Sequence, residues 1–167
     1  AALDIITDSN SNDIIVILGG SKVSDKIKVI KRLLPNVQNL LLGGAMVFTF
    51  FKAMGKNIGE SLYESKLIDE CKEVIESELF HKIIFPVDIG VTDSLKDGKR
   101  KDIPIDEIGN GEKGIDIGID TVDLFERYII GSKVLFWNGP MGIFENREYS
   151  YGTREIAKII ERTDAYT

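Results

Sequence analysis

Two lysines stand out by their spacing and by their place in the chain. Lys22 and Lys26 follow a pair of glycines and are four residues apart, so a helix would carry both on one flank. In the first turns of a helix, positive charge opposes the helix dipole by about 0.3 to 1 kcal/mol. Two ammonium groups beside backbone N–H groups suit a polyphosphate, whose reactions are catalysed mainly by positioning and charge neutralisation. A solvated basic face is the alternative, and it fits Lys28 and Arg32 better than this pair.

Three glycine-bearing loops are the second candidate feature. Residues 19–21, 43–44 and 138–142 each follow a short apolar run. Glycine allows a backbone to approach a ligand closely and to present bare N–H groups to it. For any one loop, a tight turn is an equally good explanation. Three such loops at one edge of a sheet favour a ligand site, because ligands gather at the carboxyl ends of parallel strands.

The elements that must position these residues alternate between strand and helix. Short β-branched runs predict strands at residues 14–18, 40–42, 83–87 and 134–137, although Pro86 places the third near a strand end. Apolar residues at helical spacing predict helices at 23–34, 45–54, 61–78, 120–130 and 153–162. This alternation predicts an α/β fold: a Rossmann-like, three-layer αβα domain with a mainly parallel sheet. Residues 92–114 are polar and glycine-rich, which predicts an exposed excursion or hairpin within the domain.

Composition excludes several classes of protein. The 167 residues are 43% hydrophobic and 29% charged, which is typical of one soluble domain. The longest apolar runs reach about a dozen residues, short of the roughly 20 that a membrane helix needs. A net charge of -6 disfavours nucleic acid as a partner, so any anion must be captured locally.

The single cysteine and the single histidine carry no predicted chemistry. Cys71 lies on the apolar face of a predicted helix and is expected to be a small buried hydrophobe. Without a second cysteine or a leader sequence, the chain is expected to be cytoplasmic. His81 is expected at the surface, with no zinc site and no histidine-based triad.

Standard nucleotide motifs are weak in this sequence. Residues 19–22 do not match the Walker pattern, which needs four residues between its glycines and then Lys-Ser or Lys-Thr. Residues 109–114 match G-x-G-x-x-G, but no clear strand precedes them and no helix opens after them. A Rossmann-type oxidoreductase built on this segment is therefore a remote alternative.

Five segments together are far more specific than any single motif. They are, in chain order, ILGGSKVSDKI at 17–27, LGGAMVFTF at 42–50, FPVD at 85–88, GIDIG at 114–118 and WNGPMGIFE at 137–145. Their order and spacing resemble phosphoglycerate kinase, over nearly the whole chain. The resemblance identifies residues 1–167 as most of the C-terminal, nucleotide-binding domain of that two-lobed enzyme family.

The resemblance implies reversible phosphoryl transfer between 1,3-bisphosphoglycerate and MgADP, giving 3-phosphoglycerate and MgATP in glycolysis. It implies that Lys22 stabilises the transferred group, that Lys26 binds nucleotide phosphates, and that Glu145 accepts hydrogen bonds from the ribose. The other nucleotide-binding positions that it implies are Gly19, Gly20, Ser21, Gly43, Gly44, Gly114, Asn138, Gly139 and Pro140. Magnesium would accompany ADP or ATP, and the full enzyme would be a monomer without nucleic-acid or membrane partners.

Departures from the family pattern qualify this picture. Glu112 and Lys113 stand where the family usually has an aromatic residue and methionine, which predicts a more polar rim for the adenine pocket. Ile119 replaces a usual proline. Residues 164–167 resemble the start of the strand leading to the family's phosphate loop, so the acidic residue associated with magnesium is expected beyond Thr167.

Two hypotheses remain at this stage. In the first, the chain is a portion of the kinase that is inactive alone, because the lobe that binds phosphoglycerate is absent and the sheet is incomplete at its C-terminal end. In the second, the chain is a nucleotide-binding module of the same fold that has no catalytic function.

Overall fold

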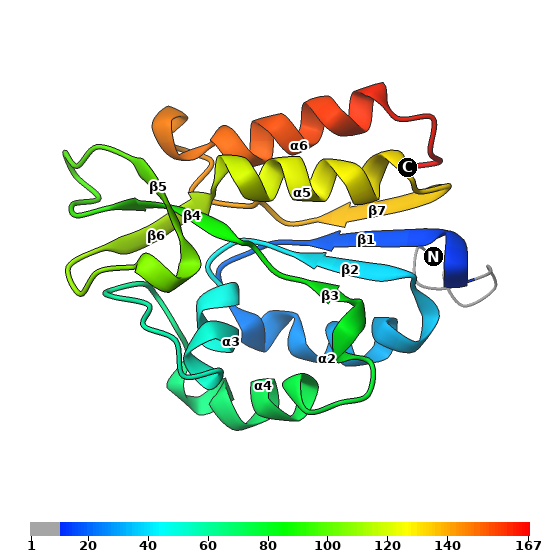
Figure 1. Ribbon diagram of the computed structural model, residues 1–167, viewed down its shortest axis with the longest axis horizontal. Helices are drawn as coiled ribbons and strands as arrows, with labels where there is room; N and C mark the ends of the chain where they lie inside the picture. Colours follow the sequence, from blue (N-terminus) through cyan, green and yellow to red (C-terminus); the bar gives the residue numbers. More distant parts are fainter. Residues whose placement is uncertain (1–10) are drawn as a thin grey trace.

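Strands and helices alternate in a computed structural model of the chain (Figure 1), which describes residues 11–167. Residues 1–10, which are predicted to belong to the same domain, lie outside the described part. The strands are β1 (Ile14–Leu18), β2 (Asn39–Leu42), β3 (Ile83–Ile84), β4 (Asp88–Thr92), β5 (Lys101–Pro104), β6 (Lys113–Ile117) and β7 (Val134–Asn138). The helices are α2 (Ile27–Leu33), α3 (Val47–Ala53), α4 (Ile68–Ile75), α5 (Ile119–Ile130) and α6 (Tyr151–Arg162).

A four-stranded parallel sheet forms the centre of the molecule, in the order β3-β2-β1-β7. Every residue of β1 is buried, which is why this strand reads as an unbroken apolar run. Successive side chains of β1 point to opposite faces: Ile14 and Val16 belong to one apolar core, and Ile15 and Ile17 to the other. The predicted parallel sheet, buried on both faces, is confirmed.

Helices cover both faces of this sheet (Figure 1). Helices α2, α3 and α4 lie on one side, and α5 and α6 lie on the other. Cys71 of α4 is a fully buried member of the first core, as predicted, and is a free thiol. Burial raises the pKa of this thiol to about 12, with smaller contributions from Glu64 and Glu70, so Cys71 is a packing residue and a poor nucleophile.

The predicted strand at 83–87 is wrong in its extent. β3 ends at Ile84, before the buried Pro86, and the chain then enters β4, which the sequence pattern did not indicate. β4 is the central strand of a separate antiparallel sheet with the order β5-β4-β6. The excursion at 92–114 thus contains β5 and the start of β6. In Figure 1 this second sheet lies beyond the carboxyl ends of β1 and β2.

Two predicted helices are shorter than expected. The segment 23–34 is a 3₁₀ turn, Val23–Asp25, followed by α2, and the segment 61–78 is helical only from Ser65, with α4 at its centre. Long-range hydrogen bonds hold residues 61–64 outside the helix. The amide of Gly114 donates to Ser61 Oγ (2.8 Å), and the amide of Ser24 donates to Glu64 Oε1 (3.1 Å). Such partners outweigh local helical periodicity.

The far edge of the sheet carries one additional pairing. Tyr166 forms an isolated parallel bridge with Val134, and the amide of Leu135 donates to the Tyr166 carbonyl (2.8 Å). Residues 164–167 therefore run alongside β7, as their resemblance to the start of a strand predicts. Within residues 11–167, no helix combines the length and apolar character that crossing a bilayer requires.

Candidate functional site

The loops after β1, β2 and β7 meet at the carboxyl edge of the parallel sheet. Hydrogen bonds between their main chains connect the three loops into one unit, which we call the loop frame (residues 19–20, 43–46 and 138–141). Four hydrogen bonds connect its parts: Gly19 N to Asn138 O (2.8 Å), Gly20 N to Pro140 O (3.0 Å), Gly44 N to Met141 O (3.0 Å) and Met46 N to Gly20 O (3.1 Å).

Glycines make this close approach possible. A Cβ atom on Gly19 would collide with the backbone of Gly139 and Pro140, and one on Gly44 would collide with the backbone of Gly20. Gly44 and Gly139 also have φ angles of 73° and 90°, which L side chains rarely adopt.

The expectation that these glycines present bare N–H groups to a ligand is wrong for four of them. The amides of Gly19, Gly20, Gly43 and Gly44 all donate to carbonyl groups within the protein. These four glycines therefore shape the site through their small size, and their own amides are not available to an anion.

Lys26 is the side chain that joins the frame to the first helix. Its ammonium group donates a hydrogen bond to Asn138 Oδ1, which links the loop after β1 to the end of β7. Both lysines are expected from the sequence in the first turns of an α-helix. Instead, Lys22 and Lys26 are the two cap residues of the 3₁₀ turn Val23–Asp25, and neither lies inside an α-helix. Lys22 is exposed and Lys26 half-buried at this edge. Two cations therefore lie at the border of the frame, and no residue of the frame itself is acidic.

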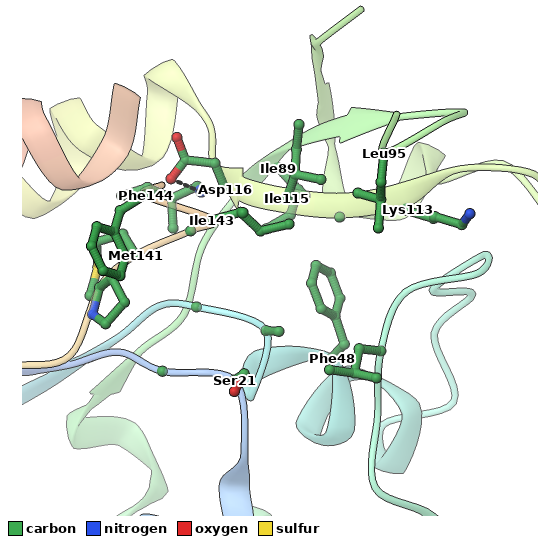
Figure 2. Close-up of a pocket in the computed structure, with 18 of the residues that line it drawn as sticks. Ser21, Phe48, Ile89, Leu95, Lys113, Ile115, Asp116, Met141, Ile143 and Phe144 are labelled. Atoms are coloured by element: carbon green, nitrogen blue, oxygen red, sulfur yellow. Dashed lines mark hydrogen bonds between the residues drawn. The ribbon is translucent and has the colours of Figure 1, made fainter. Parts of the chain in front are cut away.

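A cavity of about 540 Å³ opens between the frame and the antiparallel sheet. Figure 2 shows Ser21 and Phe48 on one side and Ile115 and Lys113 of β6 on the other. Six of the predicted nucleotide-binding residues line it: Gly20, Ser21, Gly44, Gly114, Pro140 and Glu145. Of the remaining predicted residues, Gly19, Gly43, Asn138 and Gly139 belong to the frame, and Lys22 and Lys26 lie at its border.

The walls of the cavity are largely apolar. The ring of Phe48 points from α3 toward β6 (Figure 2) and lies where a Cβ atom on Gly114 would be, so only glycine fits at position 114. Ile89, Ile115 and Met141 are buried around it. Apolar walls with a few polar groups are typical of pockets that bind flat ring systems.

Sequence reasoning missed Phe48 as a wall of the site. Phe48 lies one helical turn after the Gly43-Gly44 pair, so the same loop that forms the frame carries its ring into the cavity. An aromatic residue one turn beyond a glycine loop is the signal that would have found it.

The predicted polar rim is present at one of its two residues. Lys113 lines the cavity, and its ammonium group lies 3.7 Å from a carboxylate oxygen of Glu60, which also lines it. Glu112 does not. Its carboxylate accepts hydrogen bonds from Lys101 Nζ (2.5 Å) and from the amide of Gly109 (2.7 Å), which lower its pKa.

A buried carboxylate, Asp116, is part of the cavity lining. Asp116 of β6 accepts hydrogen bonds from Arg100 Nη1 (2.5 Å) and from the amide of Gly152 (2.7 Å). Burial raises the pKa of this carboxyl to about 6, although both hydrogen bonds act in the opposite direction. No local sequence pattern indicates the contact of Arg100 with Asp116, because the two residues are 16 positions apart in the chain.

Two other predicted features are settled by position. The 109–114 segment is a turn closed by the Glu112 amide on the Gly109 carbonyl (3.1 Å), and it leads into β6 rather than into a helix. A dinucleotide fingerprint there is excluded, since its glycines must open a helix. His81 is exposed, as predicted. Among residues 11–167, no three His, Cys, Asp or Glu side chains are grouped so as to hold a metal ion.

Comparisons with known proteins agree with each other. A family model described as phosphoglycerate kinase matches residues 1–167. The phosphoglycerate kinase of Salinispora tropica is 44% identical over 154 residues, which are 92% of this chain and 38% of that protein. That of Rubrobacter xylanophilus is 41% identical over 164 residues, which are 98% of this chain and 42% of that protein.

Solved structures extend the match to three dimensions. The phosphoglycerate kinase structure from Coxiella burnetii has a TM-score of 0.89 at 34% identity, covering 95% of this chain and 42% of that one. The structure from Pyrococcus horikoshii has a TM-score of 0.85 at 26% identity, covering 99% and 43%. The chain thus spans about two fifths of the length of these relatives.

Proposed function

The chain belongs to the phosphoglycerate kinase family, and from this premise we propose that it is most of the nucleotide-binding domain of a phosphotransferase. The proposed reaction transfers a phosphoryl group reversibly between 1,3-bisphosphoglycerate and MgADP, giving 3-phosphoglycerate and MgATP. The chain covers about two fifths of its relatives, so the reaction as a whole belongs to a larger molecule.

The cavity beside the loop frame is the proposed site of the nucleoside. Phe48 and Gly114 leave a slot lined by Ile89 and Ile115, and a purine ring inserted there would replace water on apolar walls. Glu145 lies on the same cavity and is exposed, so its carboxylate is free of burial and suits the two ribose hydroxyl groups as acceptor.

The phosphates are proposed to extend from this cavity along the border of the frame. Ser21 lines the cavity, and Lys26 follows one 3₁₀ turn later, with its ammonium group already fixed on Asn138. We expect Lys26 to hold phosphate oxygens in the ground state. Lys22, which is exposed, would neutralise charge on the phosphoryl group during transfer, where positioning and electrostatics supply most of the rate enhancement.

Magnesium, which the family uses with its nucleotide, does not find a resident site in the described residues. Asp116 is engaged by Arg100, Glu60 lies against Lys113, and residues 11–167 hold no cluster of carboxylates grouped for a cation. Magnesium usually keeps several waters and binds through substrate phosphates, so it would enter together with ADP or ATP.

The second substrate is assigned to the lobe that the relatives possess in addition. In-line transfer needs donor and acceptor held together away from water, so a chain with only the nucleotide side is expected to be inactive alone. The proposed setting is a monomeric, cytoplasmic enzyme of glycolysis, without nucleic-acid or membrane partners.

The observation that carries the proposal is the Lys26–Asn138 hydrogen bond at the border of a cavity whose other wall is apolar. It predicts separate recognition of phosphates and of the base. Lys26→Ala should weaken ADP binding about tenfold, the loss of one charge-assisted hydrogen bond, and leave adenosine binding unchanged. Both ligands can be titrated by following the fluorescence of Trp137, the single tryptophan, whose indole N–H donates to the Gly139 carbonyl of the frame (2.8 Å).

The matched control is Lys28→Ala, which removes an exposed cation two residues away in α2. ADP affinity should stay within about twofold of wild type, as for surface substitutions remote from a site. Equal losses from both lysines would show that ADP senses only general positive charge, and an equal loss of adenosine binding in Lys26→Ala would move the phosphates elsewhere.

A further inference from the structure

Within the excursion at 92–114, the side chain of Arg100 points into the protein and contacts the antiparallel sheet. Its side chain is only 13% exposed. The guanidinium donates to Asp102 Oδ1 (2.8 Å), Asp116 Oδ2 (2.5 Å) and the Ile117 carbonyl (2.8 Å), and it lies 5.2 Å from the centre of the Tyr151 ring. Each donor edge of the guanidinium is therefore used.

The strand beneath Arg100 is shaped to receive it. A Cβ atom on Gly90 would lie 2.8 Å from the guanidinium, so glycine leaves the space that the side chain fills. The pairing of β4 with β6 also shifts register between Gly90 and Val91, at this point of the sheet. A bulge with glycine is a common way to redirect a side chain next to a site.

Arg100 acts on the cavity through Asp116. The Asp116 carboxylate lies against two glycines, Gly142 and Gly152, at positions where a Cβ atom would collide with it. Gly142 begins the segment 142–145, which lines the cavity, and the next amide, of Ile143, donates to the Ile115 carbonyl (2.9 Å). The place of Asp116 therefore sets the place of this segment.

Arg100 also positions a second wall of the cavity, the one formed by Leu95. Leu95 lines the cavity from the loop that ends at Arg100. The Tyr149 hydroxyl donates to the Gly98 carbonyl of that loop (3.0 Å), and Arg100 Nη1 lies 3.4 Å from the Glu148 carbonyl. The loop is thus held at its middle and at its end against the turn that precedes α6.

Stability alone is a weak reason for this arrangement. Burying a guanidinium and two carboxylates costs desolvation energy, and a well-packed apolar cluster of the same volume is often at least as stable. Resting on the proposed nucleotide site, we propose that Arg100 is a positioning residue. Through Asp116 it holds segment 142–145, and through its own loop it holds Leu95, so that both walls are in place before the nucleotide binds.

The test compares Arg100→Gln with Lys99→Gln, its exposed neighbour. Arg100→Gln should raise the Kd for ADP about tenfold in the folded chain, as expected for a misplaced pocket wall, and Lys99→Gln should leave it within about twofold. Amide hydrogen exchange supplies a readout independent of the ligand. In Arg100→Gln, exchange at Ile143 should accelerate, with no change at Val16 in the buried β1 strand.

A double variant, Arg100→Gln with Asp116→Asn, removes one cation and one carboxylate together, so the net charge of the cluster stays as in the wild type. It should bind ADP as weakly as Arg100→Gln. Recovery of wild-type affinity in the double variant would show that an uncompensated charge, rather than lost positioning, caused the defect, and would overturn the inference. Equal acceleration of exchange at Ile143 and Val16 would overturn it too.

Failure of the proposed function gives a different result. If the wild-type chain shows no binding of ADP, the nucleotide site is wrong, yet selective exchange at Ile143 in Arg100→Gln still supports the positioning of segment 142–145. Wild-type ADP binding together with unchanged Kd and unchanged exchange in Arg100→Gln contradicts the positioning role alone.

Discussion

Two buried aspartates show how single residues hold the parts of this domain together. Asp88 of β4 accepts hydrogen bonds from the amides of Asp120 (3.0 Å) and Thr121 (2.8 Å) at the start of α5, where a carboxylate also favours the helix dipole. Asp116 of β6 does the same for Gly152 at the start of α6. Each carboxylate thereby fixes a helix to the antiparallel sheet.

Asp116 should make stability depend on pH in an unusual direction. Burial raises the pKa of Asp116 from 3.8 to about 6, although the Arg100 guanidinium beside it acts in the opposite direction. Asp102 and the ring of Tyr151 contact the same guanidinium. Between these values the folded state binds the proton more tightly than the unfolded state, so this group removes stability as the pH rises from 4 to 6. The difference between a pKa of 3.8 and one of about 6 corresponds to about 3 kcal/mol.

Asp116→Asn removes this titration. Its free energy of unfolding, measured with urea from pH 4 to pH 7, should improve relative to wild type by about 3 kcal/mol across that interval, whatever the offset at pH 4. Asp123→Asn, on the exposed face of α5, is the control and should follow the wild-type curve. Parallel curves for Asp116→Asn and wild type would mean that the carboxyl keeps its ordinary pKa.

At the scale of elements, the loop frame connects three strands that are far apart in sequence. Its rigidity comes from main-chain hydrogen bonds, and its glycines provide the space. Gly44 has φ of 73° and lies against the backbone of Gly20. Gly55, at the end of α3, has φ of 81°, and no neighbouring atom lies within 4 Å of the place that a Cβ atom would occupy. Substitutions at Gly44 and Gly55 therefore distinguish the cost of backbone strain, which both share, from the cost of steric overlap, which only Gly44 has.

Gly55→Ala should cost about 1 kcal/mol of unfolding free energy, the strain of an L residue in the left-handed region. Gly44→Ala should cost about 2 to 4 kcal/mol, because the methyl group must also displace the loop after β1. Urea unfolding followed by circular dichroism measures both. Equal losses at the two positions would indicate that the frame yields without penalty.

Sequence reasoning reaches the elements whose pattern is local. β1 and β7 are continuous apolar runs, and α5 and α6 have regular helical spacing, so all four are predicted within a few residues of their ends. The cluster of glycine loops at one sheet edge follows from the strand-to-helix connections.

Features made by distant partners are not visible in the sequence. In β4, Asp88 and Gly90 break the apolar pattern of a strand. Only the structure shows that Asp88 binds the start of α5 and that the side chain of Arg100 fills the space beside Gly90. Residues 61–64 have helical spacing, but Ser61 and Glu64 are held by strand β6 and the turn after β1. The use of the glycine amides within the frame is equally invisible, because any glycine loop leaves the partner of its N–H open.

At the scale of the whole molecule, two apolar cores share one sheet. Leu41 and Leu42 of β2 are adjacent and fully buried, but Leu41 belongs to the core under α5 and α6, and Leu42 to the core over α2, α3 and α4. Since β1 and β2 contribute to both cores, we expect the domain to unfold as one cooperative unit.

Leu41→Ala and Leu42→Ala should each lower the free energy of unfolding by about 2 to 5 kcal/mol. Trp137 packs against the core under α5 and α6, so its fluorescence reports that layer, whereas far-ultraviolet circular dichroism reports all helices. For both variants the two transitions should coincide. A Leu42→Ala transition seen by circular dichroism before fluorescence would show that the layers separate.

The loop frame also bears on how such a domain can diverge between lineages. Its geometry is written in backbone atoms and a few glycines, whereas the side chains at the mouth of the cavity, such as Leu62, Leu95, Ile143 and Phe144, are 38% to 61% exposed and contribute little to the frame. Substitution of these mouth residues should therefore cost little stability, and the buried walls around Phe48 would stay in place. The main-chain hydrogen bonds of the frame would be left in place by such substitutions.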